Sequence, residues 1–233
     1  MFPPPGATRL RLQMSELYGT TFRDRARPQA ISGTKLLGQV MFLVAIALGF
    51  AALGTWIGRD IEVGTARIMS FAGFGMLMVS SFAGERFRVG PFAMGWLFAT
   101  ALVIGLGLGP VISYFATVEP SALTQAFAGT AATVAGAGAL GFFLSKDLAR
   151  WMRPLSLVVF AACLGTILIS LFAGSVSPLL SGAIYLLSAA LIVVDFNVLR
   201  KHGTEADAIW LATGIFVSIV NIFVSLLNIF SGR

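Results

Sequence analysis

The sequence predicts an all-α integral membrane protein with seven transmembrane helices, and three observations lead to this fold class. Hydrophobic residues make up 57% of the 233 positions and charged residues only 11%, against about 25% charged residues in soluble domains. Apolar runs long enough to cross a hydrocarbon core of about 30 Å recur along the chain. Short charged segments separate these runs, so the natural environment of the chain is a lipid bilayer.

The first four helices are delimited by charged or proline-bearing turns. Such residues end an apolar helix because they are costly in hydrocarbon or cannot continue the backbone hydrogen bonds. In chain order, the predicted helices are 36–57, closed by the charged turn 58–64; 65–83, closed by 84–90; 91–117, which contains Pro110; and 119–144, which opens at Glu119 and Pro120 and stops at the charged stretch 145–153.

Three more helices complete the predicted bundle, and a polar segment precedes it. The helices are 154–173, closed by the turn 174–178; 179–199, closed by the charged link 200–207; and 208–230. We therefore divide the chain into a basic cytosolic tail, residues 1–35, and a seven-helix membrane domain, residues 36–231. No cleavable signal peptide is expected, because the first apolar run continues past signal-peptide length.

The distribution of lysine and arginine predicts the orientation of the chain. Basic residues gather on the cytosolic loops of membrane proteins. The sequence holds sixteen of them, and only Arg59, Arg67 and Arg233 fall on the minority side of the predicted spans. The others share one side: Arg9, Arg11, Arg23, Arg25, Arg27, Lys35, Arg86, Arg88, Lys146, Arg150, Arg153, Arg200 and Lys201. We expect a cytosolic N-terminus and a C-terminus outside, and no nucleic-acid partner, because no continuous basic face exists.

Several patterns exclude other classes of protein. Residues 136–141 match the dinucleotide fingerprint G-x-G-x-x-G, but that motif requires a strand before it and a helix N-terminus, whereas this one lies inside an apolar helix. We expect its glycines to serve packing, like the spaced glycines at 54 and 58 and at 105 and 109. Neither a metal-ligand spacing nor a nucleophile with its base is present, so we expect no cofactor and no enzymatic activity. His202 we interpret as solvated surface.

A carboxylate inside a predicted span is the sharpest chemical signal. Asp195 lies five residues before Arg200, roughly 7 to 8 Å inside the cytosolic end of its helix. An ionised group at the bilayer centre costs at least about 2.5 kcal/mol and normally faces a cavity or a partner. Asp195 is therefore the candidate for a site that senses protons or a cation. The alternative is an interfacial carboxylate that snorkels or pairs with Arg200.

The last predicted helix carries a polar stripe. Ser218, Asn221, Ser225 and Asn228 follow one another by three, four and three residues, so they share one helical face. A polar face avoids lipid, and we expect this helix to pack deep in the bundle. The stripe fits either hydrogen bonds between helices or the lining of a pathway.

Three segments in a fixed order carry a resemblance to a known family. They are 105–110 (GLGLGP), 195–202 (DFNVLRKH) and 221–227 (NIFVSLL). Together with the seven-span layout and the basic cytosolic side, they resemble the Bax inhibitor-1 family, also called the transmembrane Bax inhibitor motif family, over residues 36–231. The resemblance implies six helices around a central seventh helix.

In some members of this family, two aspartates control a pH-sensitive calcium leak. The resemblance maps the first onto Asp195 and the second position onto Ser218, so this sequence offers half the formal charge for a calcium ion. The two residues lie about 9 Å apart in depth for parallel helices, and contact between them would need tilt. Arg86 and Arg88, at the cytosolic end of the second helix, are alternative latch partners for Asp195.

The segment 217–227 looks most like the bacterial YccA-type branch, whose members are associated with the FtsH membrane protease as modulators. That branch also has serine at the second aspartate position. The resemblance thus implies a bacterial inner-membrane protein that modulates a membrane protein complex such as FtsH. A pH-sensitive calcium or cation leak and a structural subunit of a larger membrane assembly are the alternatives.

Overall fold

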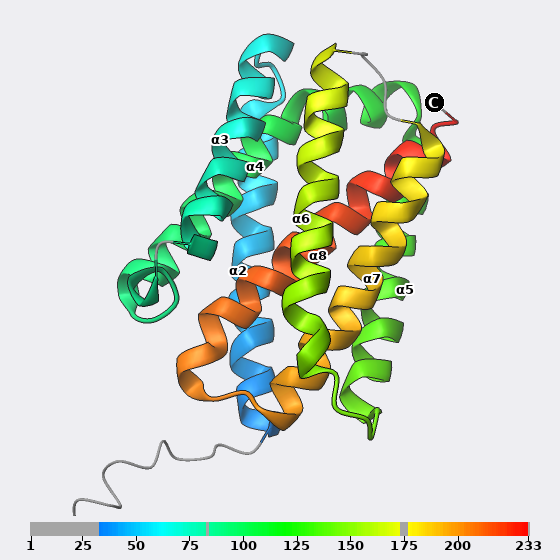
Figure 1. The fold of residues 1–233 in the computed structure, drawn as a ribbon. Coiled ribbons are helices and arrows are strands. Elements are labelled where there is room, and N and C mark those ends of the chain that lie inside the picture. Colours follow the sequence, from blue (N-terminus) through cyan, green and yellow to red (C-terminus); the bar gives the residue numbers. More distant parts are fainter. Residues whose placement is uncertain (1–32, 83, 173–176, 233) are drawn as a thin grey trace, which may run out of the picture.

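A computed structural model describes residues 33–82, 84–172 and 177–232, and these residues form an all-helical bundle without strands (Figure 1). Most of the predicted tail, residues 1–32, lies outside the described residues. Seven long helices follow one another: α2 (Gly33–Gly58), α3 (Val63–Phe82), α4 (Pro91–Val118), α5 (Pro120–Phe143), α6 (Ala149–Phe172), α7 (Pro178–Lys201) and α8 (Ala208–Phe230). Two short 3₁₀ turns, η1 (Glu85–Phe87) and η2 (Glu205–Asp207), lie between them.

Six of the described helices are long and apolar enough to cross a membrane, namely α2, α3, α4, α5, α7 and α8. The remaining long helix, α6, includes residues whose side chains are not described. The prediction of an all-α bundle with seven long helices is confirmed, and six of the seven meet the length and composition of a membrane span.

The largest difference from the predicted boundaries is the start of α6, which begins at Ala149 instead of residue 154. The Asp147 carboxylate accepts a hydrogen bond from the Ala149 N–H at 2.9 Å, and such a bond satisfies a free donor at a helix start. The helix therefore begins within the charged stretch, and Pro154 lies inside it. Pro154 is the sixth residue of α6, beyond the first four N–H groups that lack an intrahelical partner, so it removes one backbone hydrogen bond of the helix.

Glycines bring helix backbones into direct contact, as their spacing predicts. A Cβ added at Gly54 of α2 would lie 2.2 Å from the Leu102 carbonyl oxygen of α4, and one at Gly105 would lie 2.1 Å from that of Ala51. In the same way, a Cβ at Gly141 of α5 would lie 2.1 Å from the Val193 carbonyl oxygen of α7. The glycines of the G-x-G-x-x-G segment thus include one that serves helix packing.

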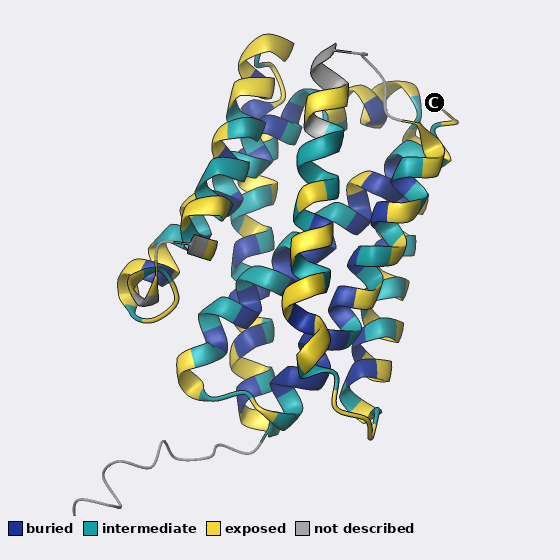
Figure 2. Cartoon of the chain, viewed as in Figure 1, coloured by how far each residue is buried: buried dark blue, intermediate teal, exposed yellow. Residues whose placement is uncertain are grey.

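Burial is greatest on α8. In the most apolar stretch of this helix 56% of residues are buried, against 11% for α3. Helix α8 packs on α7, α5 and α2, and buried residues follow its length and the inner faces of its neighbours (Figure 2). The start of α2, the α5–α6 connection and the α7–α8 connection lie at one end of the bundle, and α8 ends at the other (Figure 1).

Candidate functional site

Asp195 is the charged residue that lies deepest in a span. It belongs to the last two turns of α7 and is 1% exposed. Its Oδ2 atom has no hydrogen-bond partner among the described residues. Burial of a polar atom without a partner is costly, so Asp195 stays the candidate for a site that senses protons or a cation. None of the described ion pairs joins Asp195 to Arg200, whose Nη2 donates to the Leu144 carbonyl oxygen at 2.8 Å.

The carboxylate of Asp195 lies against α8 at Gly214. A Cβ added at Gly214 would lie 3.5 Å from Asp195 Oδ2 and 3.8 Å from Oδ1. Ser218 follows Gly214 by one helical turn on the same face. Asp195 and Ser218 are therefore offset by about one turn along α8, roughly 6 Å, which is less than the difference in depth of about 9 Å expected from the sequence.

The polar stripe of α8 faces the bundle interior. Ser218 is fully buried and Ser225 is 5% exposed, while Asn221 and Asn228 are half-buried. At the far end of the stripe, Asn228 Nδ2 donates to Ser181 Oγ of α7 at 2.6 Å. The Ser218 hydroxyl and the Asn221 amide nitrogen have no hydrogen-bond partner among the described residues.

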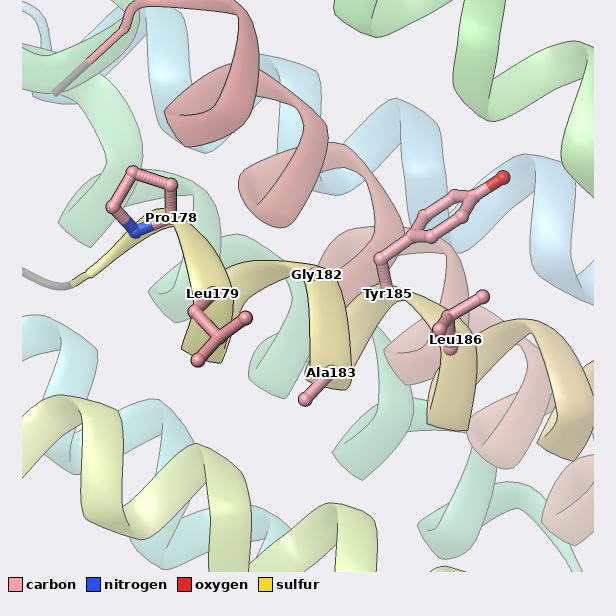
Figure 3. Close-up of a pocket in the computed structure, with 6 residues that line it drawn as sticks. All are labelled: Pro178, Leu179, Gly182, Ala183, Tyr185 and Leu186. Carbon is pink, nitrogen blue, oxygen red and sulfur yellow. The ribbon is translucent and has the colours of Figure 1, made fainter.

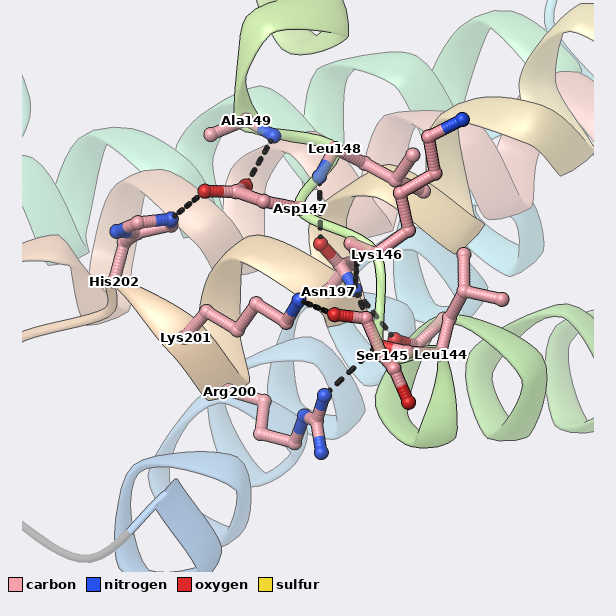
Figure 4. A network of polar contacts seen from close by, with 11 residues as sticks. Leu144, Ser145, Lys146, Asp147, Leu148, Ala149, Asn197, Arg200, Lys201 and His202 are labelled. Carbon is pink, nitrogen blue, oxygen red and sulfur yellow. Dashed lines mark hydrogen bonds and ion pairs between the residues drawn. The ribbon is translucent and has the colours of Figure 1, made fainter.

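Asn197, two residues after Asp195 on α7, binds the segment that follows α5 (Figure 4). The sequence predicted no role for it. This fully buried amide accepts a hydrogen bond from the Leu148 N–H at 2.9 Å. Its Nδ2 donates to the carbonyl oxygens of Gly141, Leu144 and Lys146 at 3.1 to 3.2 Å. One side chain thus holds the α5–α6 connection. An amide inside a span is a signal of the same kind as Asp195.

Charged side chains extend this contact to the surface of the bundle. Lys201 Nζ donates to the Ser145 carbonyl oxygen. His202 Nε2 lies 2.8 Å from Asp147 Oδ2, so His202 has a partner that its interpretation as solvated surface did not include. The hydrogen bond from the Ala149 N–H, followed by that of His202, holds the pKa of the Asp147 carboxyl below its ordinary value.

Arg86 and Arg88, the expected latch partners, contact other groups. Arg86 lies over the Phe92 ring, with its guanidinium carbon 4.8 Å from the ring centroid. Arg88 Nη2 donates to the Ser81 carbonyl oxygen at 3.2 Å, and its guanidinium lies 5.9 Å from the centroid of Trp210 at the start of α8. Among the described ion pairs, none joins either arginine to Asp195.

An open apolar hollow lies elsewhere, on the first turns of α7 (Figure 3). It is lined by Pro178, Leu179, Gly182, Ala183, Tyr185 and Leu186, and Tyr185 extends from it to α5, where its hydroxyl lies 3.0 Å from Thr133 Oγ1. None of the predicted site residues borders this hollow. In the described part of the chain, no three His, Cys, Asp or Glu side chains gather as a metal site would require.

A comparison with protein families matches this chain to one model. The model is described as "Inhibitor of apoptosis-promoting Bax1", and the match covers residues 33–233. This range includes every helix of the bundle and all the site residues described above. The sequence matches no curated protein.

Proposed function

The chain belongs to the Bax inhibitor-1 family, and from this premise we propose that it modulates a membrane protein complex, such as the FtsH protease, in the inner membrane of a bacterium. In this proposal the protein is not an enzyme and acts through contacts with its partner. Within the family we infer the YccA-type branch, which the helix segment 217–227 resembles.

The observation that carries this proposal is that Asp195 faces a glycine on α8 and not a second carboxylate. The carboxylate faces Gly214 on α8, and the sequence 208–230 contains neither aspartate nor glutamate. A second carboxylate would supply the charge that a hard divalent cation needs. With a single carboxylate on this interface, an interaction role is better supported than ion flux.

The proposal extends to the arrangement of the bundle, in which α8 is the core helix that the other six surround. Its burial, the highest among the described spans, and its packing on α2, α5 and α7 support this arrangement. The less buried helices, above all α3, then offer their faces to lipid or to a partner. The basic tail, with Arg9, Arg11, Arg23, Arg25 and Arg27, adds a cytosolic segment suited to an acidic surface.

Affinity purification from native membranes in a mild detergent tests the modulator proposal. We expect the full chain to recover a membrane protease or another large complex. A matched variant with the five tail arginines replaced by glutamine should recover less of it. If the protein is recovered alone from its native membrane, the modulator proposal is wrong. If the same partner is recovered regardless of the tail charge, the proposed role of the basic tail is wrong.

A calcium or cation leak is the second candidate, and the unpartnered buried Oδ2 of Asp195 together with the α8 stripe favours it. Purified protein in proteoliposomes should then release calcium in a pH-dependent way that Asp195→Asn alters. Absence of flux at every pH tested would exclude this candidate. Only the glycine-lined helix faces support the alternative of a structural subunit. The same affinity purification distinguishes it from a modulator, because a structural subunit would be recovered in a stable assembly without a protease.

A further inference from the structure

Two contacts define how α7 and α8 run alongside each other. Asn228 Nδ2 donates to Ser181 Oγ at one end of the pair, and Asp195 lies against Gly214 at the other. Asp195 comes fourteen residues after Ser181, and Gly214 comes fourteen residues before Asn228. Both contacts therefore fit one antiparallel register, which extends over about 21 Å.

The midpoint of this register brings together two residues with unpaired polar atoms. Seven residues from each contact, Ser188 of α7 lies opposite Asn221 of α8. The spacing of seven keeps Ser181, Ser188 and Asp195 on one face of α7, and Ser188 is fully buried. Neither Ser188 Oγ nor Asn221 Nδ2 has a hydrogen-bond partner among the described residues, so these two side chains are not bonded to each other.

Unpaired polar atoms also occur at the level of Asp195. Asp195 Oδ2 and Ser218 Oγ are both buried without a partner in the described part of the chain. Gly214, which lies between them, presents no side chain to the carboxylate. Since Cβ atoms one turn apart on a helix lie about 5 to 6 Å from each other, a group bound beside Gly214 can reach both Asp195 and Ser218.

We propose that the α7–α8 interface binds ordered water at two levels, one between Ser188 and Asn221 and one beside Asp195 in the notch left by Gly214. The donor and acceptor types decide the ligand. The amide nitrogen of Asn221 requires an acceptor, which a cation cannot supply, and Asp195 Oδ2 accepts a hydrogen bond that water can donate. Water supplies both and commonly fills buried polar sites of this kind. The Ser181–Asn228 hydrogen bond lies at the outer end of this row of polar side chains. This inference does not rest on the proposed function.

The notch beside Asp195 is tested by Gly214→Ala. The added Cβ would sit at 3.5 Å from the carboxylate oxygen, an ordinary van der Waals distance, so the alanine itself fits. It would displace water, and the full-length protein in mild detergent should unfold at a lower temperature. Gly136→Ala is the matched control, because a Cβ there meets nothing within 4 Å and alanine improves helix propensity at both positions.

The Asp195→Leu background separates hydration from steric effects. There the Gly214→Ala change should no longer lower the unfolding temperature, because the group that needs water is gone. Two results would overturn this level of the proposal: Gly214→Ala behaving like Gly136→Ala in the native background, or Gly214→Ala lowering the unfolding temperature equally in both backgrounds.

The middle level has a built-in reporter, because Cys163, the only cysteine of the chain, lies near the Asn221 side chain without a hydrogen bond to Asn221 Nδ2. Hydroxyl radicals generated by an X-ray pulse from bound water oxidise neighbouring thiols. In water labelled with oxygen-18, mass spectrometry of the native protein should find oxidised Cys163, and the paired variant Ser188→Ala with Asn221→Leu should lose this oxidation. Absence of oxidation in the native protein, or an equal extent in the variant, would show that this level is dry.

Discussion

Asn197 shows how much one buried side chain can determine in this bundle. Its amide forms four hydrogen bonds, all to backbone groups of residues 141–148. Those groups belong to the end of α5 and the connection after it, where helical backbone partners run out. The end of α7 therefore completes the hydrogen bonding of a segment some fifty residues earlier in the chain.

Replacement of Asn197 by leucine tests this role. The apolar side chain of similar size leaves the Gly141 and Lys146 carbonyl oxygens and the Leu148 N–H without their Asn197 partner, while the Leu144 carbonyl oxygen keeps Arg200. Each such loss costs roughly 1 to 3 kcal/mol when the group stays buried. We expect at least about 2 kcal/mol lower stability in thermal or denaturant unfolding of the detergent-solubilised protein. Thr124→Val is the control, because the exposed Thr124 hydroxyl donates only to Pro120 of its own helix. A loss no larger than that of the control would contradict this account.

Asp147 makes the same connection sensitive to acid. The pKa of its carboxyl is held below the ordinary value by the Ala149 N–H and then by His202. A lowered pKa in the folded state stabilises the fold above the ordinary pKa of aspartate, about 4, and this contribution is lost as the pH falls through the lowered value. The unfolding temperature should fall over this acidic range, and Asp147→Asn should flatten that part of the pH profile.

His202→Gln provides the comparison for this prediction. Glutamine can still donate to Asp147, and the larger contribution of the Ala149 N–H remains. The variant should therefore keep more of the acid dependence than Asp147→Asn does. If His202→Gln removes all of it, the histidine charge and not the backbone hydrogen bond dominates.

At the scale of helices, the α2–α4 pair depends on backbone contact at glycines. A Cβ at Gly54 would lie 2.2 Å from a backbone oxygen of α4. No side chain can move aside to relieve this clash, because the clashing atom belongs to the backbone, so the helices must separate. Gly54→Ala should cost about 1 to 3 kcal/mol, the usual range for overpacking. Gly49→Ala on the same helix is the control, because a Cβ there meets nothing within 4 Å. Thermal unfolding should rank Gly54→Ala well below Gly49→Ala, and equal stability would contradict the close approach.

The same helices explain how far the sequence could predict the fold and the site. Hydrophobic run length depends on local composition alone, so the seven helices were predicted within a few residues, except at the start of α6, where the Asp147 cap replaced the expected proline boundary. Burial of Asp195 followed from its place inside a span. Its neighbour Gly214 did not, because the tilt and register of α7 against α8 depend on contacts between distant residues. The role of Asn197 likewise depends on the path of the α5–α6 connection, which the hydrophobic periodicity of the sequence does not predict.

At the scale of the whole molecule, the seven long helices of the described residues run from the start of α2 to the end of α8. The start of α2 and the end of α8 lie at opposite ends of the bundle (Figure 1). The start of α2 shares its end with the α5–α6 and α7–α8 connections, to which Lys35, Lys146, Arg200 and Lys201 belong or lie close. The positive-inside rule predicts that this end faces the cytosol.

Reporter fusions test this orientation. Alkaline phosphatase fused after Arg233 should be active, because it folds outside the cytosol, and green fluorescent protein at the same position should stay dark. Fluorescent protein fused before Met1 should be bright. Replacement of Arg59 and Arg67, on the minority side, should leave this pattern unchanged, because their removal only strengthens the imbalance of thirteen basic residues against three that orients the chain. A fluorescent C-terminal fusion would instead place both ends of the bundle in the opposite compartments.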